Sequence, residues 1–164
     1  MRKSILFLLI LLLTIPALAQ IELQWQKSVA GGNLPAWFSP SGNTERGFAY
    51  NPVSNNLLVV SRNGGTFVKL VNANDGSDNG QLDVTGISGG TLAITDIGVS
   101  ADGAIYASNL VSASASAFKI YRWANEAAAP TVAFSGLDYM ALKRVGDNIT
   151  VLGRASDNSL QIWF

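Results

Sequence analysis

Short runs of alternating apolar and polar residues recur along most of the chain. Clusters of turn-forming residues separate the runs at intervals of about eight to twelve residues, as in an all-β meander. No stretch after residue 20 has the apolar periodicity of an amphipathic helix. The pattern therefore predicts an all-β chain of antiparallel strands.

One unit, an apolar strand, a polar turn and a second apolar strand, occurs at 47–61 and 96–109, and more weakly at 139–152. Aligning the second strands makes Leu57, Ile105 and Ile149 equivalent, at spacings of 48 and 44 residues. Repeats of about 40–50 residues are typical of four-stranded propeller blades. The chain is therefore predicted to be a partial β-propeller of about two and a half to three antiparallel four-stranded blades.

The predicted strands divide the chain after residue 19 into four parts. Residues 20–45 form an N-terminal strand, Leu23 to Ser28, and a loop. Blade 1 (46–91) has strands at 46–50, 56–61, 66–72 and 81–84. Blade 2 (92–136) has strands at 92–99, 104–108, 117–123 and 131–134. Blade 3 (137–164) is incomplete, with strands at 138–143, 148–152 and 160–164.

Fewer than four blades do not close a propeller ring, and the apolar strand that ends at Phe164 leaves an open sheet edge. Two interpretations follow. Either the chain is the N-terminal piece of a longer protein, or its open side closes by assembly. The first is favoured, because no polar segment follows Phe164. We also expect the chain to self-associate when it is produced alone.

Residues 1–19 have the pattern of a secretory signal peptide. Arg2 and Lys3 precede an apolar run at 5–15, and Ala17 and Ala19 offer a small-x-small cleavage site. The run is too short for a membrane span, which needs about 20 apolar residues. The sequence thus predicts a cleaved signal, a secreted or periplasmic location and no stable membrane span.

The composition removes several classes of function. After the predicted cleavage, 9 basic and 11 acidic residues remain and no basic patch is visible, so nucleic-acid binding is not expected. The chain has no His and no Cys. It therefore cannot build a Ser-His-Asp or Cys-His catalytic site or a His/Cys zinc site, and no cofactor is predicted.

Charged residues recur at equivalent places in the predicted blades. Four stand at the heads of the predicted first strands: Glu45, Arg46, Asp96 and Asp138. Two stand just past the predicted second strands: Arg62 and Arg154. In a propeller these positions line one mouth of the central channel, where carboxylates could bind calcium or a polar ligand. The alternative, which we favour, is that charges simply stand where strands leave the core.

The four tryptophans allow two interpretations. Trp25, Trp37, Trp123 and Trp163 could form a platform on which sugars stack. Three of the four lie in predicted strands, which favours packing between blades instead.

Three stretches, 42–52, 95–109 and 118–126, resemble a family of exported bacterial proteins whose domain has no assigned function and is propeller-like. The resemblance covers roughly Trp25 to Phe164. Members are typically much longer, which implies that this chain corresponds to their N-terminal part. The family brings no established catalytic residues to this sequence.

Two functions remain open. The favoured one is a non-catalytic exported binding or scaffold module with a protein or carbohydrate partner, completed by missing blades of the same polypeptide or by self-association. The alternative is a metal-dependent hydrolase or lactonase-like propeller. It would use the channel carboxylates of Glu45, Asp96 and Asp138 and a divalent ion such as calcium to activate water.

Overall fold

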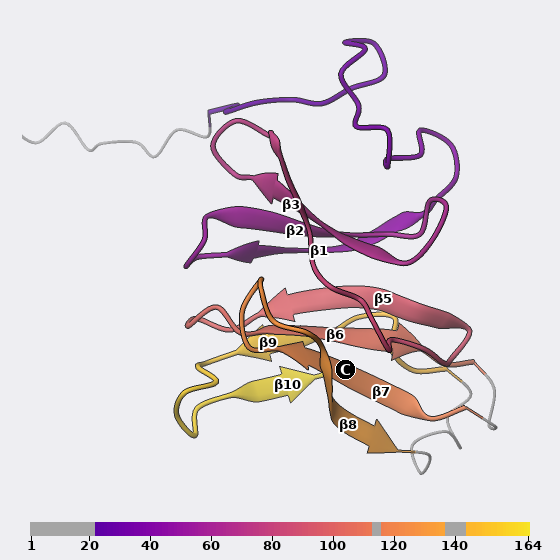
Figure 1. Cartoon of the computed structure of the whole chain (residues 1–164), viewed down its shortest axis with the longest axis vertical. Coiled ribbons are helices and arrows are strands. Elements are labelled where there is room, and N and C mark those ends of the chain that lie inside the picture. The colour runs from indigo at the N-terminus through magenta and orange to yellow at the C-terminus, as the bar shows by residue number, and fades with distance from the viewer. Residues whose placement is uncertain (1–21, 113–115, 137–143) are drawn as a thin grey trace, which may run out of the picture.

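The computed structural model describes residues 22–112, 116–136 and 144–164. All of the sheet structure in these residues belongs to two four-stranded antiparallel sheets and one two-stranded hairpin (Figure 1). The all-β prediction is confirmed. The predicted signal peptide, the predicted strand at 138–143 and Asp138 lie outside the described residues. Nowhere in the described part does a helix have the length and apolar character needed to cross a membrane.

The first sheet contains β1 (Glu45–Asn51), β2 (Asn56–Ser61), β3 (Phe67–Asn72) and β4 (Asp78–Gln81), in that order. The first three strands agree with the prediction to within one residue. The fourth lies at 78–81 and not at the predicted 81–84, because the β3–β4 turn is tight. In this turn the Gly76 amide donates to the carbonyl of Asn72 at 2.9 Å, and Gly76 has a φ of 70°.

The second sheet repeats this plan with β5 (Leu92–Val99), β6 (Ile105–Leu110), β7 (Phe118–Trp123) and β8 (Thr131–Gly136). The predicted bounds agree to within two residues. Every residue of β6 is buried, as expected for a strand that is covered on both faces of its sheet.

The third unit contains an antiparallel hairpin of β9 (Thr150–Leu152) and β10 (Gln161–Trp163). β9 runs beside β5: the Ile149 amide donates to Asp96 Oδ2 at 2.8 Å, and the Ala101 amide donates to the Gly153 carbonyl at 2.8 Å. β9 thus packs against β5, the first strand of the neighbouring sheet, and pairs with β10. The predicted first strand at 138–143 lies outside the described residues, so the place of 148–152 as a second strand stays a prediction.

Two apolar layers hold the stack together. The strand alternation of β2 directs Leu58 and Val60 into the first layer, between the two sheets, and this layer also contains Tyr121 and Trp123 of β7. The second layer lies between the second sheet and the hairpin, where Phe118 and the residues buried around it meet the apolar side chains of β9 and β10. Each sheet is thus stabilised by the sheet or hairpin beside it.

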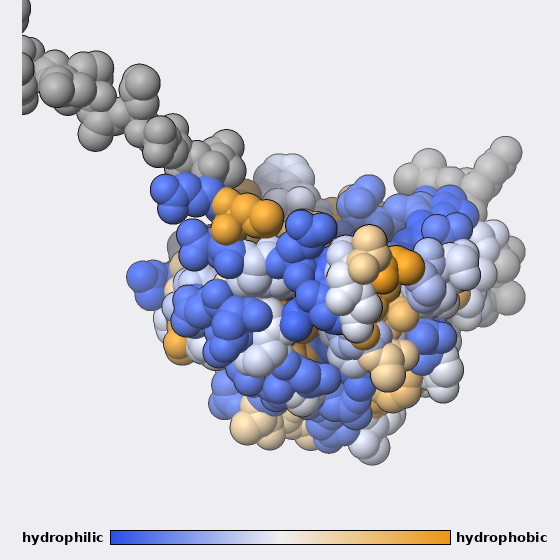
Figure 2. All heavy atoms as spheres, turned by 90° about the horizontal axis from the view of Figure 1, so that it is seen from above, coloured by the Kyte–Doolittle hydropathy of each residue, from blue (hydrophilic) through white to orange (hydrophobic). Residues whose placement is uncertain are grey.

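The N-terminal segment, residues 22–44, crosses the outer face of the first sheet (Figure 1). The strand predicted at Leu23 to Ser28 is wrong, because the segment is irregular there. Its period-two pattern has another cause: Trp25 and Lys27 both face the first sheet. Viewed from this end, the surface is mostly hydrophilic, with small separate hydrophobic patches (Figure 2).

The four-stranded antiparallel sheets, stacked through their faces, are compatible with propeller blades. The described residues do not form a closed propeller.

Candidate functional site

The charged residues predicted to line a channel mouth lie at two opposite ends of the sheets. Glu45 begins β1, and Arg62 follows β2 at the same end. Arg154 lies in the β9–β10 turn, which packs on the β5–β6 turn at the other end, where the Ala155 amide donates to Asp102 Oδ1 at 2.9 Å. The structure thus separates Arg154 from the others, and it does not describe Asp138.

Glu45 holds the N-terminal segment against the first sheet. Its Oε1 accepts hydrogen bonds from Ser61 Oγ and Thr44 Oγ1, both at 2.9 Å, and its Oε2 accepts one from the Ser39 amide at 3.4 Å. These contacts occupy much of the acceptor capacity of the carboxylate.

Arg46 and Arg62 lie near each other beside Glu45. The Arg62 guanidinium donates to the carbonyls of Asn43 at 3.0 Å and Thr44 at 3.4 Å. Partial burial lowers the pKa of Arg62, the positive charge of Arg46 lowers it further, and Glu45 opposes both effects. The result is a mixed-charge cluster at the edge of the sheet.

Asp96 is a structural link between strands. Its Oδ2 accepts the Ile149 hydrogen bond that positions β9. Within the described ranges, no three acidic side chains gather closely enough to hold a metal ion. Calcium binding, which belongs only to the less favoured interpretation, stays a hypothesis.

The four tryptophans have different environments. Trp123 is fully buried between the sheets and donates from Nε1 to the Asp83 carbonyl at 2.7 Å, which confirms the packing interpretation for this residue. Trp163 is 63% exposed on β10. Trp25 and Trp37 lie together on the outer face of the first sheet and line a hollow there.

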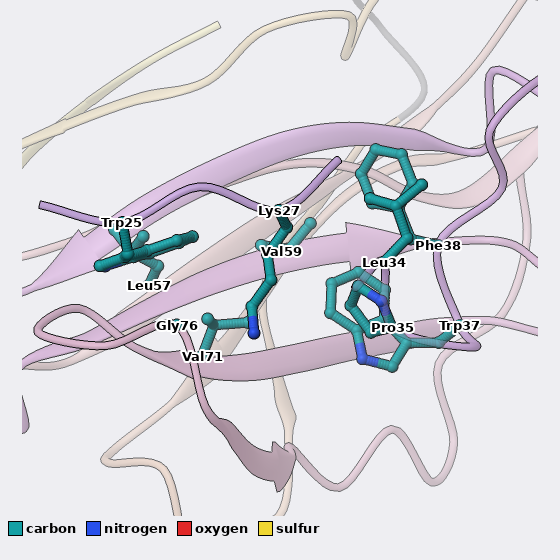
Figure 3. A pocket seen from close by; sticks show the side chains of 10 residues that line it. All are labelled: Trp25, Lys27, Leu34, Pro35, Trp37, Phe38, Leu57, Val59, Val71 and Gly76. Atoms are coloured by element: carbon teal, nitrogen blue, oxygen red, sulfur yellow. The ribbon is translucent and has the colours of Figure 1, made fainter. Parts of the chain in front are cut away.

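This aromatic hollow has a volume of about 170 Å³. Its floor is the outer face of β2 and β3, and its walls come from the N-terminal segment and the β3–β4 turn. Figure 3 shows Trp25 at one end, Trp37 and Phe38 at the other, and Lys27 between them. The lining residues are Trp25, Lys27, Leu34, Pro35, Trp37, Phe38, Leu57, Val59, Val71 and Gly76.

Hydrogen bonds fix the two indole walls. Trp25 Nε1 donates to the Ala73 carbonyl at 2.7 Å, and Trp37 Nε1 donates to Asp78 Oδ2 at 3.3 Å. A Cβ atom on Gly76 would lie 2.8 Å from the Trp25 ring, so only glycine lets the turn and the ring approach this closely. With the indole N–H groups engaged, the ring faces are what the walls can offer to a ligand.

The rim of the aromatic hollow is polar. A smaller depression of about 100 Å³ continues from it past Lys27 and Asn33 to Asp78. Asp75 also lies near Lys27: a hydrogen bond from the Ser77 amide is the main cause of its lowered pKa, and the Lys27 charge adds to the effect. The rim therefore carries the Lys27 ammonium and the Asp78 carboxylate, with the charge of Asp75 close to Lys27.

Apolar surface extends from the aromatic hollow to the edge of the sheet. On β1, Phe48 is 74% exposed and Tyr50 is 50% exposed. These residues pair across the strands with Val59 and Leu57 of the floor. The outer face of the first sheet is thus only partly covered by the N-terminal segment.

The sequence alone does not show that two of the four tryptophans, Trp25 and Trp37, share a site. The available signals were the alternation of Trp25 with Lys27 and the adjacent aromatic pair Trp37 and Phe38 within a loop rich in Gly, Pro and Ser. Neither signal reveals which sheet face the segment crosses, because that depends on tertiary packing.

Among solved structures, the chain is similar to a DUF4623 family protein from Bacteroides eggerthii, at 30% identity and a TM-score of 0.57. The likeness covers 66% of this chain and 26% of that one, so the chain spans only about a quarter of that protein. The family of that protein is a domain of unknown function, which agrees with the resemblance described from the sequence. No protein-family model and no curated protein matches the chain.

Proposed function

We propose that this protein is a non-catalytic, exported binding module made of propeller-like sheets, and that the aromatic hollow is its ligand site. The observation that carries the proposal is the aromatic hollow itself: three aromatic walls over an apolar floor, with a few charged groups at the rim. Small-molecule sites are commonly concave and apolar, with a small number of placed polar groups.

No specific observation favours the alternative function, a metal-dependent hydrolase. Two of its three proposed carboxylates, those of Glu45 and Asp96, accept hydrogen bonds from the protein itself. Their positions are accounted for by strand and segment packing.

A neutral, ring-sized probe tests the binding function. We expect 4-fluorophenol to bind the protein in ¹⁹F NMR and to lose this binding in Val59→Trp, which fills the floor of the aromatic hollow. Val132→Trp is the matched control, since Val132 is exposed on β8 and does not line the site. Equal binding by both variants, or no binding by the parent protein, would contradict the proposal.

Export is part of the same proposal and has its own test. Mass spectrometry of the protein from its producing cell should find an N-terminus at Gln20, after Ala19. A protein that retains Met1 in the cytoplasm would contradict it.

A further inference from the structure

We propose that the aromatic hollow binds one neutral pyranose ring of a carbohydrate. This inference rests on the proposed binding function and goes beyond it by naming the ligand class. Its premises are the size of the aromatic hollow, the state of its indole groups and the charges at its rim.

The size fits a single six-membered ring. The aromatic hollow measures about 170 Å³, and an apolar cavity of about 150 Å³ is enough to hold benzene. A pyranose presents an apolar C–H face on each side of its ring. Such a face packs well on the Trp25 and Trp37 rings, which are held in place by their own hydrogen bonds.

The rim favours a ring with hydroxyl groups over a hydrocarbon. The Lys27 ammonium makes no hydrogen bond to the described residues, and it stands beside the aromatic walls. The Asp78 carboxylate accepts from Trp37 Nε1 and from the Gly80 amide at 2.7 Å, and a carboxylate has about four lone-pair sites. Ring hydroxyls can donate to Asp78 and accept from Lys27.

The charge at the rim favours a neutral ligand. Asp75 and Asp78 place two negative charges near the single positive charge of Lys27. An acidic sugar would meet net repulsion there. The adjoining depression past Asn33 gives room for the hydroxyls of a second unit, so a short neutral oligosaccharide suits the site better than a free monosaccharide.

Saturation-transfer NMR tests the inference on residues 20–164. The probes are neutral trisaccharides of glucose, mannose, galactose or xylose, with a trisaccharide of galacturonic acid as the acidic comparison. We expect at least one neutral probe to bind with a millimolar dissociation constant, as is usual for ligands of this size in shallow sites. We expect Trp37→Ala to weaken this binding about tenfold.

Trp163→Ala is the matched control, because Trp163 is exposed on β10 and away from the aromatic hollow. Leu57→Trp, which fills the floor instead of removing a wall, should abolish binding even if Trp37→Ala disturbs the loop. The inference is overturned if the acidic probe alone binds, or if Trp37→Ala and Leu57→Trp bind like the parent protein. Binding of 4-fluorophenol without binding of any neutral trisaccharide overturns this inference and leaves the proposed function standing. Failure of both probes overturns the two together.

Discussion

Gly47 of β1 lies directly against the backbone of Asp96 in β5. A Cβ atom at Gly47 would be 2.6 Å from the Asp96 Cα and 3.0 Å from the Ile97 nitrogen. Both neighbours are main-chain atoms in a paired strand, so they cannot move aside as the end of a side chain can. This contact sets how closely the first strands of the two sheets approach.

Gly47→Ala should therefore destabilise the protein by about 2–3 kcal/mol, near the upper end of the usual cost of overpacking. Urea unfolding measures the effect. The control is Gly65→Ala, whose Cβ would meet only the tip of the Phe67 ring and should cost about 0.5 kcal/mol or less. Equal midpoints for the two variants would show that β1 and β5 do not pack this closely.

Glu126 links the β7–β8 connection to the β1–β2 turn. Its Oε1 accepts from Asn51 Nδ2 at 2.8 Å and from the Ser54 hydroxyl, and its Oε2 accepts from Asn56 Nδ2 at 2.8 Å. Asn51 and Asn56 are 3% and 6% exposed. Their amide groups would lose partners that water cannot easily replace.

We expect Glu126→Ala to cost about 2–4 kcal/mol in free energy of unfolding, because each buried donor left unpaired costs about 1–3 kcal/mol. Glu126→Gln keeps an acceptor oxygen and should lose less. Glu22→Ala, an exposed site in the N-terminal segment, should be neutral. Urea unfolding of the three variants compares them, and a neutral Glu126→Ala would show that this link does not stabilise the sheet packing.

The strand pattern predicted the two sheets well for a physical reason. In β2 and β6 the apolar runs are bounded by turn sequences such as Asn55 and Gly103, both of which adopt positive φ. Period-two alternation and turn chemistry are local properties, so they can be read from neighbouring residues. Strand order within each sheet then follows from short connections.

The arrangement of the third unit and the aromatic hollow could not be predicted in this way, because both depend on contacts between residues that are distant in the sequence. The apolar runs at 138–143 and 148–152 read alike as first and second strands. The contact of the β9–β10 turn with Asp102, which helps to place β9 beside β5, joins residues more than 50 positions apart. A sequence signal existed, because Ala155-Ser156-Asp157-Asn158 resembles the β5–β6 turn Ser100-Ala101-Asp102-Gly103. Likewise, Arg154 does not belong to the predicted site, because its turn lies at the opposite end of the sheets from Glu45 and Arg62.

Asp102 of the β5–β6 turn holds the β9–β10 turn through hydrogen bonds. Its carboxylate accepts from Ser100 Oγ at 2.6 Å, from the Ala155 amide at 2.9 Å and from the Ser156 amide at 2.8 Å. These hydrogen bonds, that of Ser100 first, hold the pKa of Asp102 well below its usual value of 3.8. Because the folded-state pKa is lowered, the ionised group stabilises the fold above about pH 4. That contribution is lost as the pH falls through the folded-state value.

Asp102→Asn should therefore be less stable than the parent protein at pH 7, and the difference should shrink as the pH falls below about 4. Hydrogen exchange in residues 150–163 should be faster in this variant at neutral pH. Asp83→Asn is the control: the pKa of Asp83 is also lowered, by Thr85 in its own turn, so the hairpin should keep its protection. Unchanged exchange in Asp102→Asn would mean that the turn is held by other contacts.

Gly76 has a positive φ and also contacts the Trp25 wall of the proposed ligand site. Replacing it therefore causes backbone strain and disturbs that wall, and a second glycine variant can distinguish the two effects. An alanine there would take a positive φ and would also press into the Trp25 ring. Gly80→Ala is matched, because Gly80 has a φ of 93° and a Cβ there would meet nothing within 4 Å. Both variants should lose about 1–2 kcal/mol from backbone strain. Gly76→Ala alone should shift tryptophan emission to longer wavelength, as Trp25 is displaced toward water, and should weaken 4-fluorophenol binding about tenfold. If both variants bind the probe as the parent protein does, Trp25 is not a wall of the binding site.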